Sequence, residues 1–153
     1  MLRWMVAILI LTWNLSARAG DGREQEVTLA VGGGVLHGTL ALPAAQGRVP
    51  VVLLHAGSGP TDRNGNSAML PGRNDALRML ADALARQGIA SLRYDKRGIA
   101  ASAPAGLSEA DLRFDHYTDD ATAWLRQLRA DPRLARVAMV GPSEGALIAA
   151  VAC

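Results

Sequence analysis

Hydrophobic and polar positions alternate along the chain from residue 26 onward. Residues 26–31 and 35–42 both alternate, and a run of three glycines at 32–34 separates them. Glycine tolerates the positive φ angles that tight turns need, so this pattern predicts an antiparallel hairpin. Later strand-like segments are shorter, at residues 49–54, 89–94 and 136–140. The run at 49–54 is continuously apolar, as in a central strand that is buried on both faces of a parallel sheet.

Between these runs the apolar residues recur at helical spacing. Leu77, Leu80, Ala81 and Leu84 repeat every three or four positions, and Gly88 follows as a stop signal. Residues 115–130 show the same period, with acidic residues at the start and Asp-Pro at 131–132 to end the helix. Strands that alternate with helices predict an α/β fold with a mainly parallel sheet and helices on both faces.

The last apolar run leads directly into Gly-Pro-Ser-Glu-Gly at 141–145, and helix-forming residues follow at 146–152. This order predicts a strand, a sharp turn with Ser143 at its tip, and a helix. Larger side chains at Gly141 and Gly145 would collide with the neighbouring strand or helix. The free N–H groups of the helix start favour the negative charge that develops during acyl transfer. Ser143 is therefore a candidate nucleophile, and the alternative is an ordinary serine N-cap.

A second glycine-rich segment, residues 55–66, follows the run at 49–54. Open α/β sheets bind their ligands at this end of the strands, and the backbone amides of such a loop can point at an anion. A flexible turn and a phosphate cradle are alternatives. The segment lacks the Gly-Lys-Ser/Thr ending of a nucleotide-binding P-loop. Together with Ser143, the loop is best interpreted as part of an oxyanion hole.

The first nineteen residues have the pattern of a secretory signal peptide. A positive start at Arg3 precedes the apolar residues 4–13, and Ala17-Arg18-Ala19 fits the small-x-small cleavage rule. We expect cleavage after Ala19, which leaves residues 20–153 as a mature chain that is secreted or periplasmic. An apolar run of about ten residues is short for a bilayer that needs about twenty, so a lasting membrane anchor is the disfavoured alternative.

Charge and cysteine content exclude several classes of function. The chain has 16 basic and 14 acidic residues, and removal of Arg3 and Arg18 with the signal peptide leaves 14 of each. Without a cluster of basic residues, nucleic acid is not an expected partner. The sole cysteine, Cys153, cannot form an internal disulfide, and no Cys or His group has metal-ligand spacing. We expect neither a metal nor another cofactor, and the sequence does not predict the oligomeric state.

Three segments carry a family resemblance: His-Ala-Gly-Ser-Gly-Pro-Thr-Asp-Arg-Asn-Gly at 55–65, Arg-Tyr-Asp-Lys-Arg-Gly at 93–98, and the serine turn at 141–145. In this order they resemble the α/β-hydrolase family, particularly exported bacterial esterases and serine aminopeptidase-like hydrolases. The resemblance covers residues 26–153.

The resemblance implies that Ser143 attacks an acyl carbonyl. It also implies that the backbone N–H groups of Ser58 and Glu144 bind the oxyanion. Asp95 and Arg97 are then structural residues that pin loops near the site, with a role in substrate binding as the alternative. The strands order as first, second, fourth, third, fifth. Pro142 departs from the pattern, since these turns often carry His there.

In this fold the acid and the histidine of the triad follow the serine, but no Asp, Glu or His follows Glu144. His37, His55 and His116 all precede Ser143, and a substitute triad with His55 is a minor alternative. We expect residues 20–153 to be a partial α/β-hydrolase domain, the N-terminal half of the fold, truncated after the nucleophile turn.

The predicted function is serine acyl hydrolysis of a small-molecule ester or a peptide, of carboxylesterase or peptidase type. Because the acid and the histidine are missing, we expect this chain to be inactive by itself. The alternative is a non-catalytic remnant or small-molecule binding module that keeps the sheet and the oxyanion-type loop.

Overall fold

The computed structural model describes residues 23–108 and 110–153. The predicted signal peptide, residues 1–19, lies outside this part of the chain. The strands are β1 (Arg23–Val31), β2 (Gly34–Leu42), β3 (Val49–Leu54), β4 (Ala90–Tyr94) and β5 (Leu134–Val140). The helices are α1 (Ala76–Arg86), the 3-10 helix η1 (Ala100–Ala105), α2 (Phe114–Ala130) and α3 (Glu144–Ala152).

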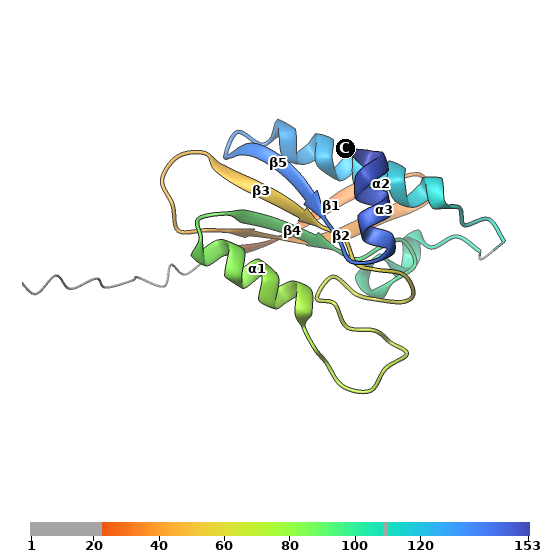
Figure 1. Ribbon diagram of the computed structural model, residues 1–153. Helices are drawn as coiled ribbons and strands as arrows, with labels where there is room; N and C mark the ends of the chain where they lie inside the picture. Colours follow the sequence, from red (N-terminus) through yellow and green to blue (C-terminus); the bar gives the residue numbers. More distant parts are fainter. Residues whose placement is uncertain (1–22, 109) are drawn as a thin grey trace, which may run out of the picture.

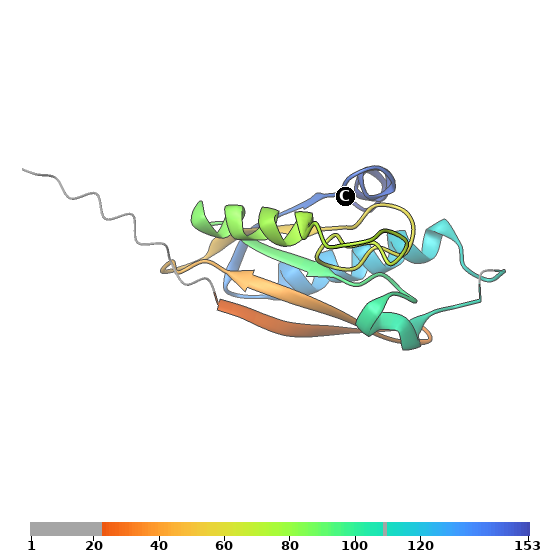
Figure 2. The same cartoon turned by 90° about the horizontal axis from the view of Figure 1, so that it is seen from below.

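The strands form one mixed sheet in the order β1-β2-β4-β3-β5, which is the predicted order (Figure 1). The hairpin β1–β2 is antiparallel, and β2 also pairs antiparallel with β4. Strands β4, β3 and β5 are parallel to one another. Figure 2 shows β1 at one edge of the sheet and β5 at the other. Parallel strands end at the same side, so the segments that follow β3, β4 and β5 meet there.

Helices cover both faces of the sheet, which confirms the predicted α/β architecture. Helix α1 lies on one face, and α2 and α3 lie on the other (Figure 1). Trp124 and Leu125 of α2 are fully buried against the strands, as is Ile148 of α3. The strands contribute further large buried side chains to the core, among them Leu36, Leu40, Val51, Leu53, Leu92, Tyr94 and Leu134. In the described part of the chain, we find no helix with both the length and the apolar character needed to cross a membrane.

The helix η1 is an element that the sequence pattern did not predict. It is short and contains Pro104, so no helical period marks it. It forms because it docks on β2: the His37 N–H donates to Ser102 Oγ at 2.9 Å. A Cβ added at Gly34 would lie 2.8 Å from Ala105 Cα, so the glycine permits this close approach.

Candidate active site

Ser143 lies between the end of β5 and the start of α3, as the sequence predicts. Its backbone has φ 52° and ψ −122°, a conformation that residues other than glycine rarely adopt. The side chain makes no capping hydrogen bond to the helix, so the alternative of an ordinary serine N-cap is wrong. The Ser143 hydroxyl has no hydrogen-bond partner among the described residues, and is therefore free to meet a ligand.

The glycines around Ser143 are required by close packing. A Cβ added at Gly141 would lie 2.8 Å from the Gly145 Cα and 2.8 Å from the His55 carbonyl oxygen. A Cβ added at Gly145 would lie 3.0 Å from the same His55 oxygen and 3.1 Å from the Ala56 oxygen. This agrees with the predicted collisions with a neighbouring strand and helix. The turn therefore rests directly on the segment that leaves β3.

Residues 56–59 of that segment have carbonyl groups that are bonded and N–H groups that are not. Ala56 O accepts from His55 Nδ1 at 2.6 Å, and Gly57 O accepts from Lys96 Nζ at 2.5 Å. Ser58 O accepts from the Thr61 hydroxyl, and Gly59 O accepts from Lys96 Nζ and from the Thr61 N–H. None of the four N–H groups has a partner among the residues that the structure describes. Successive unbonded N–H groups of this kind are able to bind an anion.

The two predicted oxyanion donors are both available. The Glu144 N–H is the first of α3 and is unbonded within the described residues, as is the Ser58 N–H. Ser58 is exposed, and its neighbour Gly57 packs against the turn. A Cβ at Gly57 would lie 3.8 Å from Ser143 Cβ and 3.4 Å from the Pro142 carbonyl oxygen. The structure thus brings the loop and the serine together, with Gly57 as the contact residue.

His55 is buried beneath this loop. Its ring packs edge-on against Tyr94, with centroids 5.4 Å apart, and Nε2 is buried without a hydrogen-bond partner among the described residues. Burial lowers the pKa of His55 from 6.5 to about 4; the bond to Ala56 O opposes the shift and the nearby Lys96 charge adds to it. The neutral ring carries its proton on Nδ1, facing Ala56 O. His55 therefore orders the loop, and this geometry does not favour a role as the base of a substitute triad.

The hydrogen bonds of the other two histidines involve backbone groups. His37 lies on β2, where its N–H and carbonyl bond to Ser102 and Asp95. His116 accepts the Arg113 N–H at 3.0 Å and so caps the start of α2. In residues 23–108 and 110–153, no group of three His, Cys, Asp or Glu side chains is arranged to hold a metal ion.

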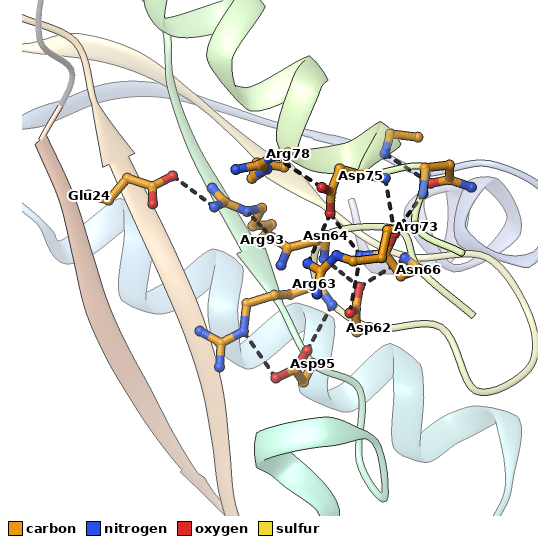
Figure 3. A network of polar contacts seen from close by, with 12 residues as sticks. Glu24, Asp62, Arg63, Asn64, Asn66, Arg73, Asp75, Arg78, Arg93 and Asp95 are labelled. Carbon is orange, nitrogen blue, oxygen red and sulfur yellow. Dashed lines mark hydrogen bonds and ion pairs between the residues drawn. The ribbon is translucent and has the colours of Figure 1, made fainter. Parts of the chain in front are cut away.

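Charged side chains hold the next part of the loop, residues 60–75, against the sheet (Figure 3). The carboxylate of Asp95 accepts the Arg63 N–H at 2.7 Å and the Arg63 Nε at 3.0 Å. Arg97 forms a buried bidentate ion pair with Asp120. Asp95 and Arg97 thus make the structural contacts predicted for them. A cavity of about 440 Å³ borders Arg63 and Asp95, but its lining does not include the serine turn.

Lys96 is a residue of this site that the sequence pattern did not single out. Its side chain is only 1% exposed, although it is charged, and Nζ reaches Gly59 O at 3.0 Å as well as Gly57 O. Burial lowers the pKa of Lys96, and the carboxylate of Glu144 opposes that shift. The signal in the sequence is that Lys96 is the sole lysine beside fifteen arginines.

Known hydrolases resemble the chain in sequence and in structure. A sequence model of the family described as serine aminopeptidase, S33, matches residues 70–153. Dienelactone hydrolase from Anabaena variabilis is 26% identical with a TM-score of 0.62, and the match covers 86% of this chain and 56% of that enzyme. The protein XC6422 from Xanthomonas campestris, described as an α/β serine hydrolase without lid, is 25% identical with a TM-score of 0.58. That match covers 82% of this chain and 53% of the other.

Brefeldin A esterase, a bacterial homologue of human hormone sensitive lipase, shares the fold at 20% identity and a TM-score of 0.62. The match covers 97% of this chain and 37% of the esterase. The chain thus spans between 37% and 56% of the length of these three proteins. No curated protein matches in sequence.

Proposed function

Since the chain belongs to the serine aminopeptidase, S33 family of α/β hydrolases, we propose that it is a serine acyl hydrolase of carboxylesterase or peptidase type with Ser143 as its nucleophile. The observation that carries the proposal is the strained Ser143 backbone beside residues 56–59, whose N–H groups have no hydrogen-bond partner in the described part of the chain. Strain of this kind is retained where function requires a particular geometry. The substrate class is a small-molecule acyl ester or a peptide.

In the proposed reaction, Ser143 Oγ attacks the acyl carbonyl carbon and its proton passes to a base. The carbonyl oxygen becomes an oxyanion, which the N–H groups of Glu144 and Ser58 stabilise. Collapse of this intermediate expels the alcohol of an ester or the amine of a peptide, which takes up a proton. Water then hydrolyses the acyl-serine and restores the hydroxyl.

The base is the part of this reaction that the described residues do not supply. The Ser143 hydroxyl bonds to no histidine, and the His55 proton faces a carbonyl oxygen. We therefore expect this chain alone to hydrolyse esters at least about 10³-fold more slowly than an enzyme with a complete triad. The same observation favours the second candidate function, a non-catalytic module that binds small anions at the loop.

The test uses a fluorophosphonate, which phosphonylates an attacking serine. The purified chain is treated with the reagent, with and without imidazole as a replacement base, and the modified peptide is identified by mass spectrometry. We expect modification at Ser143, accelerated at least about tenfold by imidazole, because a general base typically contributes 10²-fold or more. Ser143→Ala should abolish the modification, whereas Ser108→Ala, at an exposed serine outside the turn, should not.

Two outcomes would redirect the proposal. Absence of modification at Ser143 even with imidazole would reject the nucleophile. If inorganic phosphate then shifted the Ser58 amide resonance in the same protein, the binding module would be the better account. Rapid ester hydrolysis without imidazole, lost in Ser143→Ala, would instead reveal a base in the chain.

Export is a separate part of the proposal. The charged start, the apolar residues 4–13 and Ala17-Arg18-Ala19 support a secreted or periplasmic mature protein. N-terminal sequencing of protein recovered from the periplasm or medium should begin at Gly20. A full-length cytoplasmic product that keeps Met1 would contradict it.

A further inference from the structure

The sole lysine of the chain is buried behind the proposed oxyanion loop. Lys96 follows β4 directly, and its Nζ lies 2.5 Å from Gly57 O and 3.0 Å from Gly59 O. A buried ammonium usually pairs with a carboxylate. Here the closest carboxylate oxygen, on Glu144, is 3.9 Å away, so the main partners are backbone carbonyls. The buried ammonium of Lys96 thus bonds mainly to the backbone of the loop, and its distance to the nearest carboxylate is longer.

The bond to Gly57 O fixes the direction of a specific N–H group. All described peptide bonds are trans, and in a trans peptide the C=O of one residue and the N–H of the next point in opposite directions. Because Gly57 O faces Lys96, the Ser58 N–H points away from the ammonium. That N–H is the predicted oxyanion donor, and it is unbonded within the described chain.

Lys96 also connects the loop to the serine turn and to α2. The carboxylate of Glu144, the residue whose N–H is the other predicted donor, faces the ammonium. On α2, the ring of Tyr117 lies 5.6 Å from Nζ, within range of a cation–π contact. One cation therefore lies close to both donor-bearing segments, although α1, β4, η1, α2 and β5 lie between these segments in sequence.

We propose that Lys96 is a positioning residue that holds the Gly57–Ser58 peptide with its N–H directed to the oxyanion. This inference rests on the proposed function, since it assigns the peptide's N–H to that reaction. A competing explanation is that Lys96 only stabilises the folded chain. The two explanations differ in the rate at which the folded protein reacts, and in the state of one amide.

The experiment compares Lys96→Met and Lys96→Arg with the wild type and with Arg48→Met. Arg48 is a matched control because its guanidinium also donates to a backbone carbonyl, that of Leu134, at the opposite end of the parallel strands. The rate of Ser143 phosphonylation with imidazole is measured for the folded fraction of each protein. Serine labelled with ¹⁵N reports the Ser58 amide without any chemistry.

We expect Lys96→Met to slow phosphonylation at least about tenfold, because loss of a whole oxyanion donor costs about 10²- to 10³-fold. The Ser58 amide signal should shift or broaden in the same variant. Lys96→Arg should recover part of the rate, since its N–H groups can still reach carbonyls, and Arg48→Met should match the wild type in both measurements. A Lys96→Met protein that loses stability but keeps the wild-type rate and Ser58 signal overturns the inference.

The two proposals can fail separately. If wild-type Ser143 is not phosphonylated, the proposed function fails, and the Ser58 amide signal alone decides whether Lys96 orients the peptide. If Lys96→Met does not fold, Lys96→Arg and wild-type protein labelled with ¹³C at lysine Cε replace it. The single lysine signal should then move when Ser143 is phosphonylated, and an unmoved signal rejects the role. If neither variant folds and wild-type Ser143 does not react, Lys96 is a residue of the fold only.

Discussion

Two neighbouring parts of the connection between β3 and α1 use their backbone in opposite ways. In residues 62–66 every N–H is bonded: the Asp62 carboxylate accepts two of them, and carbonyls or Asp95 accept the others. In residues 56–59 no N–H is bonded within the described chain, whereas the carbonyls are. We call these the closed segment and the open segment.

The difference is informative because unbonded N–H groups are costly wherever water is excluded. The closed segment shows that this sequence can satisfy a glycine-rich loop with its own side chains. The open segment lies only a few residues earlier, and His55 and Lys96 bond its carbonyls from behind. An arrangement that ties down the carbonyls and leaves the amides free is suited to an external anion. The closed segment therefore serves to hold the loop in place, and the open segment is the part suited to bind a ligand.

The largest effect is expected where the serine turn presses on the start of the open segment. Gly141→Ala places a methyl group 2.8 Å from backbone atoms of both Gly145 and His55, and neither backbone can move without displacing the turn. We expect a loss of about 2–3 kcal/mol in the free energy of unfolding, measured with urea. The matched Gly32→Ala, which meets nothing within 4 Å, should stay within about 0.5 kcal/mol of the wild type. Equal losses of stability in both variants would contradict the prediction that close packing at Gly141 excludes a larger side chain.

The next effect comes from His55, which holds the carbonyl side of the open segment. Its pKa is about 4 in the folded chain against 6.5 as an ordinary value, so acid protonates the unfolded chain first. The contribution of the neutral His55 ring to the free energy of unfolding is fully present above pH 6.5. It is lost as the pH falls toward 4, at about 1.4 kcal/mol per pH unit. Between pH 7 and 5 the wild type should lose about 2 kcal/mol more than His55→Asn, as measured by urea unfolding at both values. Parallel pH profiles for the two proteins would contradict the buried neutral ring.

A smaller effect is expected from the closed segment. Asp62→Ala removes the acceptor of the Asn64 and Asn66 N–H groups, which lie 2.8 and 2.9 Å from its Oδ1. We expect a loss of about 1–2 kcal/mol and faster amide exchange in residues 62–66. In the wild type, residues 56–59 should already exchange faster than residues 62–66. Comparable protection of both segments in the wild type would remove the distinction between them.

The elements of this fold follow from local patterns in the sequence, and the contacts between distant residues do not. The alternating hairpin, the apolar runs and the glycines at 141 and 145 predict β1 to β5 and the serine turn, because period and backbone freedom are local properties. The strand order came from the family resemblance and is confirmed. The helix η1 and the carbonyl contacts of Lys96 depend on residues far away in the chain, so no period or spacing reveals them. For the site, the sequence predicted where Ser143 and its loop lie, but not which side chains hold the loop.

The smallest effect on stability, but a visible one on solubility, is expected at the β5 edge of the sheet. In the described chain β5 pairs only with β3, and Val140 of β5 and Leu147 and Val151 of the following helix α3 are exposed apolar residues. An unpaired strand edge beside apolar side chains is a template for association, so we expect the wild type to be marginally soluble.

Leu147 is 58% exposed, so Leu147→Gln should change the free energy of unfolding by no more than about 0.5 kcal/mol. It should nevertheless raise the concentration at which light scattering first detects aggregates. Val35→Gln is the matched control, since Val35 is 41% exposed but lies on the hairpin at the other side of the sheet. If both variants raise that concentration equally, general surface polarity is the cause. If only Leu147→Gln does, association starts at β5, beside the turn that carries Ser143, and the proposed site must be assayed in dilute protein.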